Sequence, residues 1–114
     1  MATQIIEKER LKDYLDHFSI VIPTELTEIE VASLELGDQI AAEWVPLSGL
    51  SYDPKDDVIL VDLDNGKYEH TIQQPVEFAV QEGDDGIQSF EVKCSKGHLH
   101  IIKFRQPRQL PPAA

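Results

Sequence analysis

The chain has 114 residues, the length of a single domain, and a domain of this size buries roughly 65% of its unfolded surface without disulfides. Twenty-one Asp and Glu against ten Lys and Arg give a formal net charge of −11, which repels phosphate backbones and anionic lipids. We therefore expect no nucleic-acid partner and no membrane surface. The start of the chain lacks a signal-peptide pattern, no apolar run approaches the roughly 20 residues of a membrane span, and Cys94 is the only cysteine. These features predict a cytoplasmic protein without disulfides.

Apolar residues at helical spacing, among them Leu11, Leu15 and Phe18, predict an amphipathic helix over residues 7 to 19. Beyond Pro23 the apolar period changes to nearly two, which is typical of strands. The fold class is therefore predicted as α+β, with this N-terminal helix packed on an antiparallel sheet of about six or seven strands. One apolar face predicts that the sheet curls into a partial barrel. We expect one domain over residues 1–107 and a mobile tail over 108–114.

Glycine turns in the second half of the chain allow a register to be derived for each hairpin. Asn65-Gly66 is the residue pair preferred in two-residue hairpin turns. Its predicted pairs, all on one face, are Leu63 with Tyr68, Val61 with His70 and Ile59 with Ile72. A three-residue loop over Asp84-Asp85-Gly86 predicts pairs of Val80 with Phe90, Phe78 with Val92 and Val76 with Cys94. Cys94 is thus expected on the core face.

The turn at Lys96-Gly97 has two possible registers. A two-residue loop pairs Cys94 with Leu99 and turns His98 and His100 toward the opposite face. A loop that also includes Ser95 places Cys94 opposite His98 and brings one sulfur and two imidazoles together. We favour the two-residue loop because it keeps the core apolar.

Cys94, His98 and His100, joined by His70, are the residue types that zinc or copper binds. Under the favoured register they do not meet, so we predict no metal site and treat Cys94 as a small buried apolar residue. The acidic clusters do not form an EF-hand, because the spacing to Gly66 or Gly86 would put Val61 or Gln81 at its first ligand position.

No catalytic or cofactor motif is recognisable in the sequence. Ser48 lies in Pro46-Leu47-Ser48-Gly49, which lacks the G-x-S-x-G pattern of a nucleophile elbow. We therefore predict that the protein is not an enzyme and needs no cofactor.

The stretch around the single tryptophan is the most apolar part of the chain outside the hairpins. Such a tryptophan is more often in the core, and the alternative is an interaction surface for a protein partner or for self-association. The residues of that surface would be Trp44, Val45, Leu47 and Leu50.

Three segments resemble a family of uncharacterised small bacterial proteins, a domain of unknown function. They are Glu9 to Ser19 (ERLKDYLDHFS), Pro46 to Ser51 (PLSGLS) and Ile101 to Arg105 (IIKFR). The likeness extends from residue 1 to about 107. It implies a fold shared with relatives and supplies no activity, substrate or cofactor.

Two functions follow from these observations as expectations. The first is a non-enzymatic cytoplasmic binding or protein-interaction module. The alternative is a small-ligand or metal-binding β-barrel protein that uses His70, His98, His100 and Cys94 on its inner face. An enzyme assembled from distant strands is a third class.

Overall fold

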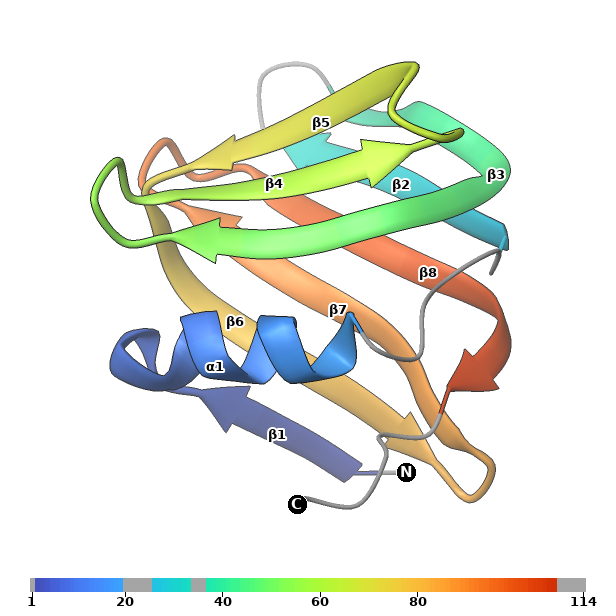
Figure 1. Ribbon diagram of the computed structural model, residues 1–114, viewed down its shortest axis with the longest axis horizontal. Helices are drawn as coiled ribbons and strands as arrows, with labels where there is room; N and C mark the ends of the chain where they lie inside the picture. The colour runs from blue at the N-terminus through green and yellow to red at the C-terminus, as the bar shows by residue number, and fades with distance from the viewer. Residues whose placement is uncertain (1, 20–25, 34–36, 109–114) are drawn as a thin grey trace.

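The computed structural model describes residues 2–19, 26–33 and 37–108 (Figure 1). This part of the chain contains one helix, α1 (Lys8–Phe18), and eight strands. The strands are β1 (Ala2–Ile6), β2 (Leu26–Ser33), β3 (Gly37–Asp53), β4 (Val58–Leu63), β5 (Tyr68–Gln73), β6 (Pro75–Gly83), β7 (Gly86–Cys94) and β8 (Leu99–Arg108). The predicted helix is confirmed, and the predicted boundary at residue 107 falls inside β8. Residues 109–114, most of the predicted tail, lie outside the described residues.

All eight strands belong to one antiparallel sheet in the order β1-β6-β7-β8-β2-β3-β4-β5. The sheet curls without closing, because β1 and β5 are its two outer strands. The prediction of six or seven strands was too low. It missed β1, an edge strand whose residues 2–5 are exposed and which shows no apolar alternation. Its backbone pairs with β6, and the Thr3 hydroxyl donates to Gln81 Oε1 at 2.7 Å.

Strand β3 joins the two halves of the curled sheet. Its first part pairs with β2 and its second part with β4, and Figure 1 shows it bending from one layer into the other. The register with β2 is interrupted near Trp44, which has a positive φ of 46°. Irregularities of this kind increase the bend of a strand. β3 continues without a break through Pro46 and Gly49.

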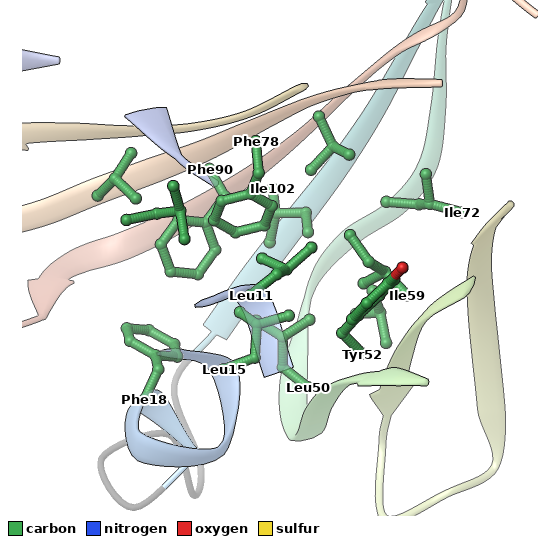
Figure 2. Packing of buried hydrophobic residues seen from close by; sticks show 14 of the residues in the cluster. Leu11, Leu15, Phe18, Leu50, Tyr52, Ile59, Ile72, Phe78, Phe90 and Ile102 are labelled. Atoms are coloured by element: carbon green, nitrogen blue, oxygen red, sulfur yellow. The ribbon is translucent and has the colours of Figure 1, made fainter. Parts of the chain in front are cut away.

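The core lies between the two halves of the sheet, and α1 covers it with Leu11, Leu15 and Phe18 (Figure 2). Phe90 is fully buried at the centre, with its ring 4.8 Å from that of Phe18 and 4.9 Å from that of Phe78. The three buried residues of α1 therefore belong to the same core cluster as the buried residues of the sheet.

The β4–β5 hairpin has the predicted register, with Val61 opposite His70 and Ile59 opposite Ile72. The β6–β7 hairpin also pairs Phe78 with Val92 as predicted. The pairing of Val76 with Cys94 was wrong. An irregularity between Pro75 and Glu77 shifts the register, so that Cys94 lies opposite Pro75 and Val76 is exposed. Cys94 is nevertheless in the core, at 7% exposed, as expected.

Candidate metal centre

The hairpin between β7 and β8 has the register that sequence analysis did not favour. Val92 pairs with His100, and the Cys94 N–H donates to the His98 carbonyl at 3.0 Å. Ser95, Lys96 and Gly97 therefore form the loop, which is closed by the Gly97 N–H donating to the Cys94 carbonyl at 3.0 Å. Gly97 has a φ of 83°, a left-handed conformation that glycine adopts without strain. The prediction that the histidines point away from Cys94 was wrong.

Residues further along β8 explain why the β7–β8 hairpin adopts this register. The observed register directs Ile102 and Phe104 into the core, where they are 0% and 6% exposed. Phe104 contacts Phe90 with ring centroids 5.3 Å apart, and Phe18 with centroids 5.4 Å apart. The favoured register would have turned Ile102 and Phe104 outward, because side chains alternate along a strand. Packing of the aromatic cluster therefore brings His100 to the inner face.

The result is a convergence of one thiol and two imidazoles. One ligand atom each from Cys94, His98 and His100 lies within 4.8 Å of the other two. A tetrahedral zinc ion, with Zn–S bonds of about 2.3 Å and Zn–N bonds of about 2.0 to 2.1 Å, places neighbouring ligand atoms about 3.3 to 3.6 Å apart. A contraction of about 1 Å therefore brings the three atoms to bonding positions. His98 is partly exposed beside the loop.

His70 approaches the same group from the opposite half of the sheet. Its Nε2 lies 3.0 Å from His100 Nδ1, and the two ring centroids are 5.1 Å apart. His70 is on β5, an outer strand, whereas His100 is on β8 between β7 and β2. The structure thus brings together all four predicted candidates, three by convergence of ligand atoms and the fourth through a hydrogen bond.

The two inner imidazoles are electrostatically suited to metal binding. The pKa of His100 is lowered to about 4, mainly by burial and to a smaller extent by the neighbouring His70 and His98. Burial also lowers the pKa of His70. Both rings are therefore neutral at pH 7, which is the form that carries a free nitrogen lone pair.

The loop that carries His98 is fastened to the end of β5. The Ser95 N–H donates to the Gln74 carbonyl at 3.0 Å, and the Ser95 hydroxyl donates to Gln74 Oε1 at 2.7 Å. Gln74 itself has a positive φ of 52° where the chain passes from β5 to β6. These contacts hold the loop against the chain segment that follows β5. Sequence analysis missed the contact between Gln74 and Ser95, because nothing local in the sequence indicates that the two residues meet.

The predicted interaction surface divides between core and surface. Leu47 and Leu50 are 0% and 2% exposed, so their assignment to a surface was wrong. They follow the bend of β3, which turns its second part over the core. Trp44 is 37% exposed and Val45 is partly buried. Val45 borders a depression of about 400 Å³, whose other lining residues are Ala41, Leu63, Tyr68, Glu69 and His70.

The acidic turn that follows β3 satisfies its own carboxylates. Asp53 Oδ1 accepts the Lys55 N–H at 2.9 Å, and Asp57 Oδ1 accepts the Tyr52 hydroxyl at 2.6 Å. Lys8 Nζ lies 2.9 Å from the same Asp57 oxygen. Asp53 and Asp57 thus take part in hydrogen bonds and an ion pair with neighbouring residues of the protein.

The fold and the site define a small antiparallel-sheet protein with a cluster of one thiol and two imidazoles on the inner face of its curved sheet. The chain belongs to the family described as "Family of unknown function (DUF5335)", whose model matches residues 2–113. It is also similar to an uncharacterized protein of Aquifex aeolicus (strain VF5), with 39% identity over 111 residues, covering 97% of this chain and 99% of the relative. No solved structure matches the chain. Within the described ranges, no helix is both long enough and apolar enough to span a membrane.

Proposed function

We propose that the protein is a non-enzymatic binding module whose ligand is a transition-metal ion, with zinc as the first choice. Cys94, His98 and His100 would be its protein ligands. The observation that carries the proposal is the convergence of their ligand atoms to within 4.8 Å of one another. The burial of Cys94 in the apolar core and of His100 supports the proposal.

The donor set argues for zinc over the hard cations. A thiolate and two imidazoles suit zinc or copper, whereas magnesium and calcium require oxygen ligands. Cys94 is the chain's only cysteine and has no disulfide partner within it. A free thiol of this kind persists in a reducing compartment, so the proposal places the protein in the cytoplasm.

The test is a titration of the metal-free protein with Zn²⁺ in competition with a chromophoric chelator. We expect one zinc ion per chain, and Co²⁺ in its place should give a sulfur-to-metal charge-transfer band. Cys94→Ser should abolish that band, and His98→Gln should abolish stoichiometric binding.

The matched control is His17→Gln, which removes the one histidine outside the cluster, on α1. It should bind zinc as the wild-type protein does. Absence of binding at stoichiometric zinc, or binding that persists unchanged in Cys94→Ser, would contradict the proposal.

Self-association through the surface around Trp44 is a second candidate. It is favoured by the exposure of Trp44 at 37%, Ile40 at 51% and Tyr68 at 63%, of which Tyr68 lines the depression described above. Exposed aromatic residues are enriched in protein interfaces. A sedimentation series should show a dimer that Trp44→Ser abolishes. A wild-type protein that stays monomeric into the high micromolar range would exclude this candidate.

A further inference from the structure

The contact between His70 and His100 constrains which nitrogen of His100 can reach a metal ion. Two neutral imidazoles 3.0 Å apart can form a hydrogen bond only if one nitrogen carries the proton and the other a lone pair. The atoms that meet are His70 Nε2 and His100 Nδ1. When His100 Nδ1 is the donor, its Nε2 is left with the lone pair, on the other side of the ring.

Resting on the proposed zinc centre, we propose that His70 is a positioning residue. Its Nε2 accepts a hydrogen bond from the Nδ1–H of His100 and thereby presents His100 Nε2 to the metal. Histidines that bind metals commonly donate their other ring N–H to an acceptor, which fixes the tautomer and the ring orientation. In this protein another imidazole is the acceptor. His70 then acts through His100 and does not itself bind the ion.

The fold holds His70 where this role requires it. Its backbone lies opposite Val61 in the β4–β5 hairpin, and Val61 is fully buried. His100 lies opposite Val92 in β7 and Val31 in β2. Each ring is therefore carried by a paired strand, and the hydrogen bond spans the two halves of the curled sheet. The partly exposed position of His70 also places it beside the depression near Tyr68.

The experiment measures zinc affinity by chelator competition in His70→Phe, which removes the acceptor, and in His70→Gln, which keeps one. We expect His70→Phe to weaken zinc binding by about 10- to 100-fold, the range found for other outer-shell partners, with one ion still bound. His70→Gln should recover most of that loss, and His17→Gln should cause none. The visible spectrum of bound Co²⁺ should keep its band positions in all three variants, because the atoms bonded to the metal stay the same.

A second measurement needs no substitution. Nitrogen NMR of the wild-type zinc form should show His100 with a protonated Nδ1 and a metal-bound Nε2, and His70 with an unbound, hydrogen-bond-accepting Nε2. Unchanged affinity in His70→Phe, or a His70 nitrogen with a metal-bound shift, would overturn the inference. A shift of the Co²⁺ bands in both His70 variants would do the same, because it would make His70 a ligand. Failure of the wild-type protein to bind zinc would instead refute the proposed function.

Discussion

Two tyrosines pack in the core, the partly buried Tyr14 and the buried Tyr52, and their hydroxyl groups have different surroundings. Tyr14 on α1 packs edge-on against Phe78 and Phe90, with ring centroids 6.2 Å away in each case. Its hydroxyl oxygen is enclosed, and no described residue makes a hydrogen bond to it. The Tyr52 hydroxyl, in contrast, donates to Asp57 Oδ1 at 2.6 Å. Removal of the hydroxyl should therefore have opposite effects at the two positions.

We predict that Tyr14→Phe stabilises the fold by about 1 kcal/mol. Burial of an unsatisfied polar group costs about 1 to 3 kcal/mol, and the lower end applies because the Tyr14 side chain is only partly buried. The ring and its aromatic contacts remain in the variant. With a urea m-value of about 2 kcal/mol/M, the midpoint should rise by about 0.5 M. Tyr52→Phe should lower the midpoint, because it leaves Asp57 without this donor.

Urea unfolding followed by circular dichroism of the wild-type protein and both variants gives the comparison. The slope of the transition should be equal in the three proteins, so that the shift in midpoint reports stability alone. A midpoint for Tyr14→Phe at or below the wild-type value, at an equal slope, would refute the reasoning. It would mean that the enclosed hydroxyl already makes a favourable interaction that compensates for its burial.

The remaining predictions concern alkaline pH, the core and the loop. Burial raises the pKa of Tyr14 and of Tyr52 to about 12. The stability that these protonated hydroxyl groups contribute is therefore complete below pH 10 and is lost as the pH rises through 12. Urea midpoints should fall over that interval, and they should fall less in Tyr14→Phe. Phe90→Ala should cost about 3 to 5 kcal/mol in the same assay, because a fully buried ring is removed, and a loss below 1 kcal/mol would contradict the central position of Phe90. Gly97→Val should destabilise the fold by about 1 to 2 kcal/mol, because a residue with a side chain is strained at this positive φ. The added side chain meets no neighbouring atom, so the strain of the backbone is the whole effect. Unchanged stability would show that the loop adopts another conformation.

Local turn chemistry was sufficient to predict the β4–β5 hairpin. Asn65 and Gly66 both have a positive φ, of 58° and 83°, as the preferred two-residue hairpin turn requires. That turn fixed the register, including the position of His70 opposite Val61. The amphipathic helix was predictable for a similar reason, because its apolar residues repeat within the segment itself.

The β7–β8 register was not predictable in this way, because both loops are locally acceptable and the deciding contacts are distant in sequence. Phe104 meets Phe18, a residue on α1 at the other end of the chain. Leu99 and Ile101, which the favoured register would have buried, stay half-buried on the outer face. The rule that the core stays apolar was applied to the residues nearest the turn, whereas the aromatic residues farther along the strand determined the outcome.

The candidate centre follows from this competition between the two registers. Full burial of a large apolar side chain contributes about 1.5 to 3 kcal/mol, so inward placement of Ile102 and Phe104 is worth roughly what Leu99 and Ile101 would have gained. The observed register also gains the contacts of Phe104 with Phe18 and Phe90 in the aromatic cluster. Its cost is the placement of His100 inside, where a polar group destabilises the fold unless it is hydrogen-bonded. His70 supplies one hydrogen-bond partner, and a metal ion on the other nitrogen would supply the second. The aromatic packing that decides the register thus also places His100 beside Cys94 and His98, where the proposed centre lies.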